Sequence, residues 1–328
     1  MTLETPAETA GISIDPHRVP TPPPFPAFHA PGKPEEVSEE SLLHRELSYA
    51  ITVGFRRLSM DVWLPRKAAE AAVPLVVWIH GGAFQLGDRR ELPPTFVPDS
   101  VFRRLNEAGI ACATVDYRYS LEAPFPAQLH DIKAAVRYLR HHADVLGIDG
   151  ERIGAWGESA GGHLAALLGL TGSREDLEGG LGVQGQSSAV NAVVDFYGIS
   201  SLNDVSRRLG VESFLNGPLT AAVPPGASLD PGTMLVGGAP DPALLHAASP
   251  LGYVTAGAPP FLLVHGNRDG LVPHSQSELL ADALERAGVQ NKLITIDGAD
   301  HCFFFAEDEV DWILETSVDF FRHEFGQQ

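Results

Sequence analysis

The chain of 328 residues carries 23 basic and 42 acidic side chains, a formal net charge of −19 at pH 7. Such an excess of negative charge repels phosphate backbones and anionic membrane surfaces, so nucleic acid is not expected as a partner. With 44% hydrophobic and 20% charged residues the chain has the composition of a globular protein, and we expect one large domain with an inserted cap.

The two cysteines and the N-terminus bear on where the protein works. Cys112 and Cys302 give no disulfide framework, which favours a reducing compartment. The first residues lack the basic start and apolar run of a signal peptide, and no stretch is long and apolar enough to insert into a bilayer. The sequence therefore predicts a cytoplasmic protein without membrane insertion, and it is compatible with a homodimer.

Residues 1–40 are rich in proline and glutamate, and residues 19–26 must be largely extended. We interpret this segment as an N-terminal arm that precedes a domain over residues 41–328. A sharper hypothesis places Phe25 and Phe28 of the arm near the mouth of the functional site.

The first half of the domain predicts an antiparallel edge followed by buried strands. Two partly alternating runs, 43–51 and 55–64, are typical of an antiparallel pair. The continuous apolar run 74–80 is typical of a strand buried on both faces of a parallel sheet. The next predicted elements are a helix over 101–108, a strand over 110–115 and a helix over 126–146.

The second half alternates helix and strand around one interruption. Residues 200–250, rich in glycine and proline and containing apolar residues such as Phe214 and Leu235, are interpreted as the cap. The repeated βα units predict an α/β fold, a mostly parallel, doubly wound sheet with helices on both faces. The elements around the cap are predicted at 160–170 (helix), 192–197 (strand), 260–265 (strand), 275–287 (helix), 292–296 (strand) and 310–325 (helix).

Ser159 lies between a predicted strand and a predicted helix. The glycines Gly157, Gly161 and Gly162 permit a tight turn that would hold Ser159 in a strained conformation with its hydroxyl projecting, as in a nucleophile elbow. The five-residue pattern alone is a weak signal, because a chain this rich in glycine contains it by chance in roughly one case in five. The alternative is an ordinary tight connection, so the rest of the chain must decide.

A serine hydroxyl needs a general base, usually a histidine that a carboxylate orients. On a doubly wound sheet these groups lie in loops after the carboxyl ends of strands. The loops after the last two predicted strands offer Asp269 and His301. We favour Asp269 over Asp300 as the orienting acid, because Asp300 adjoins His301 in sequence and neighbouring side chains rarely face each other.

The tetrahedral intermediate of acyl transfer carries an oxyanion that backbone amides stabilise. The amide of Ala160 lies at the start of a predicted helix, whose dipole also favours negative charge. The loop over residues 80–84 follows the first buried strand and can direct further amides to the same place.

This ordered set of motifs resembles the α/β-hydrolases of the hormone-sensitive-lipase-like and bacterial carboxylesterase group, including the branch with acetyl xylan and feruloyl esterases. The order serine, aspartate, histidine is that of α/β-hydrolases and differs from chymotrypsin and subtilisin. The matching residues extend from about residue 40 to the end: His80-Gly81-Gly82-Ala83-Phe84, Asp116-Tyr117-Arg118, Gly157-Glu158-Ser159-Ala160-Gly161-Gly162, the loop of Asp269, and His301.

The resemblance implies an α/β-hydrolase fold with Ser159 as nucleophile, His301 as base and Asp269 as its partner. It also implies three oxyanion donors, the amides of Gly82, Ala83 and Ala160. No metal or cofactor is needed for this chemistry.

Two residues depart from the pattern of the lipase-like group. Many members have a third glycine where this chain has Ala83, and an aspartate where it has Glu158. The alanine keeps a donor role only if its φ is negative. For Glu158 we hypothesise an ion pair with a cation such as Arg118, and we expect the segment 116–118 to brace loops near the site.

Several other polar residues receive structural interpretations. The segment 140–144 resembles metal-ligand spacing, but it lies at a predicted helix C-terminus, where cationic side chains offset the dipole, so no metal site is predicted. Cys302 is interpreted as a packed thiol. His274 and His323 are interpreted as solvated helix residues.

The sequence therefore predicts a serine carboxylesterase that hydrolyses small short-chain or aryl esters through an acyl-enzyme, since the cap is too short for a large lipase lid. Two alternatives stay open, because a fold does not fix the leaving group. One is cleavage of amides by the same residues, as in peptidases or aryl formamidases of similar fold. The other is a non-catalytic ligand-binding protein, against which the complete set of Ser159, Asp269 and His301 argues.

Overall fold

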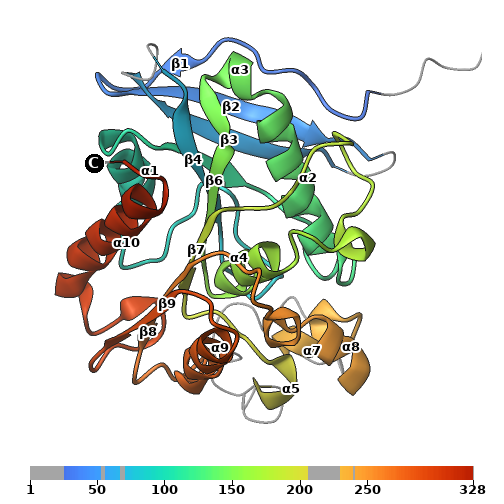
Figure 1. The fold of residues 1–328 in the computed structure, drawn as a ribbon, viewed down its shortest axis with the longest axis vertical. Helices are drawn as coiled ribbons and strands as arrows, with labels where there is room; N and C mark the ends of the chain where they lie inside the picture. The colour runs from blue at the N-terminus through green and yellow to red at the C-terminus, as the bar shows by residue number, and fades with distance from the viewer. Residues whose placement is uncertain (1–25, 53–55, 67–70, 206–229, 239–240, 328) are drawn as a thin grey trace, which may run out of the picture.

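The computed structural model describes residues 26–52, 56–66, 71–205, 230–238 and 241–327. These residues form a nine-stranded sheet with the order β1-β2-β3-β5-β4-β6-β7-β8-β9 and helices on both faces (Figure 1). The strands are β1 (Glu35–Glu36), β2 (Ser41–Ala50), β3 (Leu58–Pro65), β4 (Val73–Ile79), β5 (Ala111–Val115), β6 (Ile148–Glu158), β7 (Ala192–Phe196), β8 (Phe261–Gly266) and β9 (Asn291–Ile296).

The sheet has an antiparallel edge and a parallel remainder. The pairs β1–β2, β2–β3 and β3–β5 are antiparallel, whereas the strands from β5 to β9 in the sheet order pair in parallel. The antiparallel edge predicted from runs 43–51 and 55–64 is confirmed for the described residues, which exclude Phe55. Strands β5, β7 and β8 are buried along their whole length, which explains their continuous apolar sequences.

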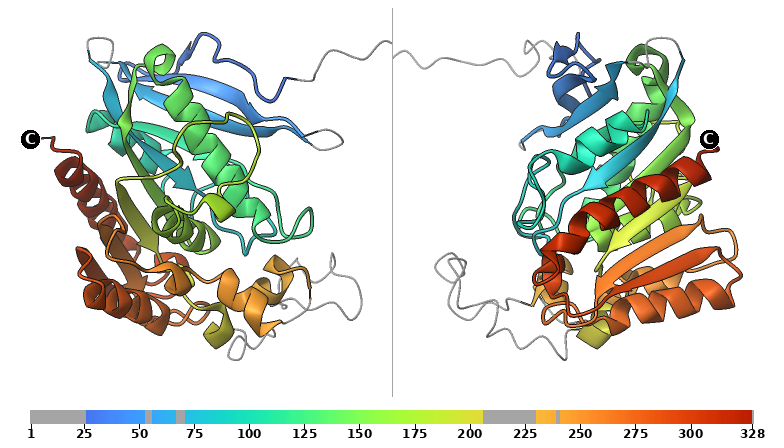
Figure 2. Two further views of the ribbon diagram at one scale, coloured as in Figure 1. Left: turned by 45° about the vertical axis from the view of Figure 1, so that its right-hand side comes forward. Right: turned by 90° about the vertical axis from the view of Figure 1, so that its left-hand side faces the viewer.

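Alternate residues of the parallel strands belong to two separate cores, because successive side chains point to opposite faces of a sheet. In β4, Leu75 and Val77 join the core under α2, α4 and α9, whereas Val76 and Trp78 join the core under α1 and α10. Figure 2 shows α2 across one face of the sheet and α10 across the other. These helices are α1 (Ser100–Glu107), α2 (Ala127–His141), α4 (Ala160–Leu170), α9 (Ser275–Arg286) and α10 (Val310–Glu324). The predicted α/β-hydrolase architecture is thereby confirmed.

The single helix predicted over residues 126–146 is wrong, because the structure divides it. α2 ends at His141, and a short helix α3 (Ala143–Leu146) follows. His142 leaves helical geometry, with φ −103° and ψ 18°. Its ring packs against Phe28, at a centroid distance of 5.7 Å, so a tertiary contact competes with the helical periodicity at this point.

The hypothesis that Phe28 lies near the mouth of the functional site is also wrong. Its ring packs against Tyr138, His141 and His142 at the C-terminal end of α2, with centroid distances of 5.7–6.0 Å. The Tyr138 hydroxyl donates to the His29 carbonyl at 2.7 Å and fixes the same contact. Phe25 lies outside the described residues, and β1 adds part of the predicted arm to the sheet edge.

The segment predicted as a cap, residues 200–250, is helical where it is described. Leu235 and Leu245 of this segment are buried in the core that holds α4. Phe214 lies outside the described residues. The helices are α5 (Leu202–Val205), α7 (Pro231–Leu235) and α8 (Pro242–Ala247), and the 3-10 helices of the described chain are Glu175–Leu177, Pro250–Tyr253, His301–Phe303 and Glu307–Glu309.

The topology brings four loops to one edge of the sheet. Parallel strands end at the same edge, and the loops after β4, β6, β8 and β9 carry Gly82, Ser159, Asp269 and His301 respectively.

Candidate active site

Ser159 connects the end of β6 to the first residue of α4 in a strained turn. Its backbone has φ 55° and ψ −119°, and its amide donates to the Phe196 carbonyl at 2.8 Å. A Cβ on Gly157 would lie 2.1 Å from the Gly161 carbonyl oxygen, and a Cβ on Gly161 would lie 2.0 Å from the Ile79 oxygen. The two glycines are therefore required for the turn, which has the strained conformation predicted from the sequence.

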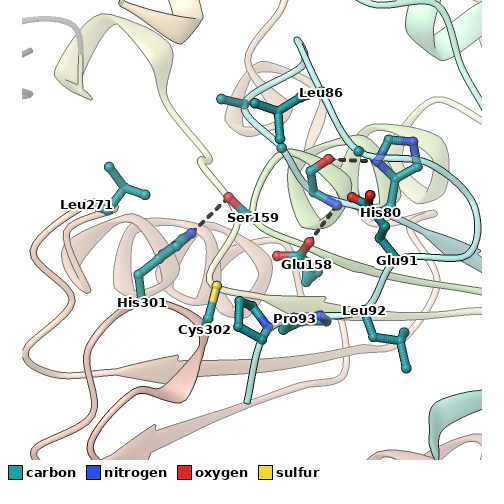
Figure 3. Close-up of a pocket in the computed structure, with 15 residues that line it drawn as sticks. His80, Leu86, Glu91, Leu92, Pro93, Glu158, Ser159, Leu271, His301 and Cys302 are labelled. Carbon is teal, nitrogen blue, oxygen red and sulfur yellow. Dashed lines mark hydrogen bonds between the residues drawn. The ribbon is translucent and has the colours of Figure 1, made fainter. Parts of the chain in front are cut away.

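Three side chains from three loops form a hydrogen-bonded relay. The Ser159 hydroxyl donates to His301 Nε2 at 3.0 Å (Figure 3), and His301 Nδ1 donates to Asp269 Oδ2 at 2.7 Å. The Asp269 side chain is fully buried, and the His301 side chain is 12% exposed. This arrangement can transfer a proton from the serine to the imidazole when the hydroxyl attacks an acyl carbon.

The Asp269 carboxylate is saturated with donors. Its Oδ1 accepts from the amides of Leu271 and Val272 at 2.8 and 2.7 Å, and His265 Nε2 lies 3.2 Å from its Oδ2. Burial opposes ionisation, but the hydrogen bonds and charges of His265 and His301 outweigh it and hold the pKa of Asp269 well below its usual range. The sequence analysis missed His265, whose place at the end of β8 was the available signal.

The loop of His301 is strained and anchored in the core. Cys302, Phe303 and Phe305 all have positive φ, between 58° and 67°. Phe303 is fully buried and stacks on Phe96 at a centroid distance of 6.4 Å. Strain of this kind persists where packing fixes the backbone, and here it fixes the direction of the imidazole.

The Asp300 carboxylate binds backbone amides, and the acid hydrogen-bonded to the His301 imidazole is Asp269. Asp300 Oδ1 accepts from the amides of His301 and Gly270 at 2.7 and 2.8 Å, which ties the loop after β9 to the loop after β8. The ring of Tyr197 lies edge-on to His301 at 4.7 Å, a contact that the sequence analysis did not anticipate.

Of the three residues whose amides are expected to bind an oxyanion, Gly82 and Ala83 line the same pocket as Ser159, and Ala160 follows Ser159 in the chain. Ala160 is the first residue of α4, and within the described chain the amides of Gly82, Ala83 and Ala160 have no recorded acceptor. Gly82 has φ 102°, and a Cβ there would lie 2.2 Å from the Leu86 carbonyl oxygen.

The negative φ that we required of Ala83 is absent. Ala83 has φ 54°, in the left-handed region, which an alanine enters at a cost of about 1–2 kcal/mol. The condition that we placed on its φ was therefore wrong: alanine adopts this conformation, and its amide has no backbone acceptor among the described residues. The amides of Gln85 and Leu86 both donate to the Gly82 carbonyl, at 2.9 and 3.1 Å, and this turn holds Ala83 in place.

The hypothesis that Glu158 pairs with Arg118 is wrong. The Arg118 guanidinium binds Asp131 on α2, with Nη2–Oδ1 at 2.7 Å, because these two groups face each other across the loop after β5. Glu158 Oε1 instead accepts from the Gly81 amide at 2.6 Å. Burial raises the pKa of Glu158, although the charge of protonated His301 and the Gly81 amide act in the opposite direction.

The segment 116–118 braces the site, as predicted. Arg89 Nη1 donates to Asp116 Oδ2 at 2.6 Å. The Tyr117 hydroxyl donates to the carbonyls of His80 and Gly81 at 3.0 and 3.3 Å, and its ring stacks on His80 at 4.4 Å.

A pocket of about 280 Å³ opens over Ser159 and His301. Its walls include Leu86, Leu92 and Leu271 (Figure 3). Among the described residues that line it there are carboxylates, of Glu91 and Glu158, but no lysine or arginine. The pocket thus suits an uncharged organic group.

Cys302 also lines this pocket and is partly buried. Burial raises the pKa of its thiol well above the usual range, so the group stays protonated and unreactive, in agreement with a packed thiol.

The remaining polar candidates are not part of the relay, but the interpretation of His274 as a solvated helix residue is wrong, because its ring packs against His265 at a centroid distance of 5.4 Å. Arg140 donates to the Gly150 carbonyl at 2.8 Å, His274 Nε2 lies 2.9 Å from Thr295 Oγ1, and His323 is exposed beside Glu324. In the part of the chain that the structure describes, we find no cluster of three or more side chains suited to a metal ion. Across the same residues, every helix is too short or too polar to cross a bilayer.

Sequence comparison shows the family. The BD-FAE family model matches residues 60–284, a span that includes Ser159 and Asp269 and ends before His301. Esterase LipQ of Mycobacterium tuberculosis is 30% identical over 255 residues, which make up 77% of this chain and 56% of that protein. The chain thus spans a little over half the length of this curated relative.

Solved structures share the fold over most of both chains. A truncated carbohydrate esterase from gut microbiota superposes with a TM-score of 0.74 at 28% identity, covering 89% of this chain and 99% of that one. Est2, a thermophilic esterase from the Planctomycetes species Thermogutta terrifontis solved with propionate bound, gives 0.65 at 27% identity, covering 93% and 97%. The chain belongs to the BD-FAE family, within the α/β-hydrolase esterases.

Proposed function

We propose that this chain is a serine carboxylesterase that hydrolyses short-chain or aryl carboxylic esters through an acyl-enzyme. The observation that carries the proposal is the relay from Ser159 Oγ through His301 to Asp269, with distances of 3.0 and 2.7 Å. It lies at the base of a pocket whose lining is largely uncharged.

The first half of the reaction forms the acyl-enzyme. His301 takes the Ser159 proton as Oγ bonds to the ester carbonyl carbon, and the carbonyl π pair moves to oxygen. The amides of Gly82, Ala83 and Ala160 bind that oxyanion, and Asp269 stabilises the imidazolium. The carbonyl re-forms as the alkoxide leaves with the proton from His301.

The second half regenerates the serine. A water molecule gives a proton to His301 and attacks the acyl carbon, and the tetrahedral intermediate collapses to the carboxylic acid. Ser159 recovers its proton from His301. Every proton in the cycle passes through the same imidazole, so no cofactor enters the scheme.

The expected substrate size follows from the pocket. Leucine side chains bound its volume of about 280 Å³, so a short acyl chain or an aryl group can be enclosed, whereas a long chain would extend into solvent. The propionate in the Est2 structure supports a short acyl group for the family fold.

Hydrolysis of p-nitrophenyl esters from acetate to palmitate, by the wild type and by Ser159→Ala, tests the proposal. We expect turnover that falls with acyl length and a loss of about 10⁴-fold or more in kcat for Ser159→Ala. A preference for long emulsified chains, or turnover that survives Ser159→Ala, would contradict it. The matching p-nitroanilide tests the amidase alternative, which predicts comparable amide and ester rates.

Some finer predictions from the sequence accompany this proposal. They are the division into an arm over residues 1–40 and a capped domain over 41–328, a cytoplasmic location, and a homodimer. Size-exclusion chromatography with light scattering measures the last of these.

A further inference from the structure

Glu158 lies between the nucleophile and the loop that carries the oxyanion donors. It is the last residue of β6, and β6 pairs with β4 in a register that sets Gly157 opposite Ile79. The chain beyond Ile79 continues to Gly81, so the Glu158 carboxylate reaches the Gly81 amide at 2.6 Å. Figure 3 shows Glu158 directed toward this loop, with His301 on the other side of Ser159.

The contact between Glu158 and Gly81 leaves no room for a side chain at position 81. A Cβ there would lie 2.1 Å from Glu158 Oε1 and 2.5 Å from Cδ. The carboxylate therefore packs directly on the backbone of the loop, in addition to accepting its hydrogen bond. A carboxyl group accepts from an amide whether it is neutral or ionised, so this contact holds the loop in either protonation state.

The carbonyl side of Gly81 is held as well. His80 Nδ1 lies 2.7 Å from the Gly81 oxygen, and the Tyr117 hydroxyl donates to the same oxygen at 3.3 Å. Because the peptide unit is planar and trans, the N–H of Gly82 must point opposite to the C=O of Gly81. Fixing Gly81 at both ends thus fixes the direction of the Gly82 amide.

The position of Glu158 is costly for the fold. The residue is buried, burial raises its pKa, and no lysine or arginine of the described chain forms an ion pair with it. An acidic group without a cation partner in such a place destabilises the folded state unless its contacts compensate. The Glu158 carboxyl group accepts from the Gly81 amide, has the Tyr197 hydroxyl nearby and interacts electrostatically with His301.

We propose that Glu158 is a positioning residue, which holds Gly81 and thereby sets the amides of Gly82 and Ala83 where the oxyanion forms. The inference rests on the proposed ester hydrolysis. Glu158 acts on the reaction through the loop, so its loss weakens binding of the transition state more than binding of the substrate.

The test compares Glu158→Ala with Glu158→Gln on p-nitrophenyl acetate. We expect Glu158→Ala to lower kcat about 10²-fold, as loss of an oxyanion donor does, with KM changed less than about threefold. Glu158→Gln keeps an acceptor for the Gly81 amide and is expected to stay within about tenfold of the wild type. A trifluoromethyl ketone, whose carbonyl oxygen becomes an oxyanion when Ser159 adds to it, should bind to Glu158→Ala more weakly by the factor lost in kcat/KM.

Asp195→Asn is the matched control. Asp195 is also a buried carboxylate, on the neighbouring strand β7, and it accepts a backbone hydrogen bond from Gly198 at 2.9 Å, away from the oxyanion loop. We expect its kcat to stay within about threefold of the wild type, because the hydrogen bond of Asp195 goes to Gly198 and not to the loop over residues 80–84.

A folded Glu158→Ala that keeps kcat within about threefold of the wild type would overturn the inference, as would a Glu158→Gln that falls as far as the alanine variant. If Glu158→Ala does not fold, Tyr117→Phe removes one of the two side-chain contacts at the Gly81 oxygen, leaving that of His80, and should lower kcat about threefold to tenfold at constant KM. An unchanged kcat there would also overturn it. A wild type without esterase activity would refute the proposed function instead.

Discussion

The two sides of the site each hold a buried carboxylate, but the protein surrounds the two carboxylates differently. On the side built by the loops after β8 and β9, Asp269 accepts from two backbone amides and lies against two imidazoles. On the side built by the ends of β4 and β6, Glu158 accepts from the Gly81 amide, with the hydroxyl of Tyr197 nearby.

The pKa values move in opposite directions as a result. Burial acts against ionisation at both positions, but it is outweighed at Asp269, whose pKa lies well below the usual range, and it prevails at Glu158, whose pKa is raised. The number of donors therefore decides which carboxylate is a permanent anion. In the proposed mechanism Asp269 orients the His301 imidazole, which transfers the protons, while Glu158 holds the backbone amide of Gly81.

The largest expected effect is that of Asp269→Asn. Asparagine has a single oxygen, so its NH₂ group would face either the amides of Leu271 and Val272 or His301 Nδ1. The first orientation would set the NH₂ group against two amide donors, so the second is favoured. That orientation removes the acceptor that sets the tautomer of His301, and we expect kcat to fall about 10⁴-fold with the fold retained. Steady-state kinetics with circular dichroism measure both quantities.

Asp300→Asn is the control for this prediction. Asparagine can still accept from the His301 and Gly270 amides through its one oxygen, so we expect a loss of no more than about tenfold. If Asp300→Asn proves more damaging than Asp269→Asn, the orienting acid has been misassigned.

The contrast between the two sides also separates what the sequence could reveal from what it could not. Asp269 follows a strand with a clear apolar run, and His301 follows a more polar strand that continues the alternation of helix and strand. Strand ends meet at one edge of a parallel sheet, so their proximity follows from order alone. Glycine spacing likewise located the turn at Ser159.

The contacts of Glu158 and Arg118 depend on quantities that the sequence does not display. The partner of Glu158 follows from the register between β4 and β6, and a shift by one residue would turn its side chain to the other face of the sheet. Arg118 has a carboxylate closer in space, Asp131, on the next helix. The break at His142 has the same origin, since a tertiary contact with Phe28 overrides a periodic pattern.

Asp195 is a third buried carboxylate, with the Gly198 amide as its donor. Here the expected effect is on the free energy of unfolding. Burial, opposed by the Gly198 amide, raises the pKa of Asp195 from 3.8 to about 7. The folded protein therefore keeps a proton that the unfolded chain releases above about pH 4, and the free energy of unfolding decreases as the pH rises from about 4 to 7. The decrease is on the order of 4 kcal/mol at most.

Asp195→Asn removes this decrease. Urea unfolding of wild type and variant between pH 4 and 8 should give two curves that differ in slope below pH 7 and run parallel above it. Asp282→Asn, at an exposed position on α9, is the matched control and should reproduce the wild-type slope. Parallel curves for Asp195→Asn across the whole range would mean that Asp195 is ionised in the folded protein.

The smallest expected effect concerns His265, which lies behind Asp269. His265→Ala removes one donor from Asp269 and leaves three, the two loop amides and His301. Since a single hydrogen bond contributes about 1 kcal/mol, we expect kcat to fall about threefold to tenfold, far less than for Asp269→Asn. His265→Gln, which can restore a donor to the carboxylate, should recover part of the loss. If His265→Ala instead matches Asp269→Asn in a protein that remains folded, the two imidazoles share the orienting role, and the donors around Asp269 do not act independently.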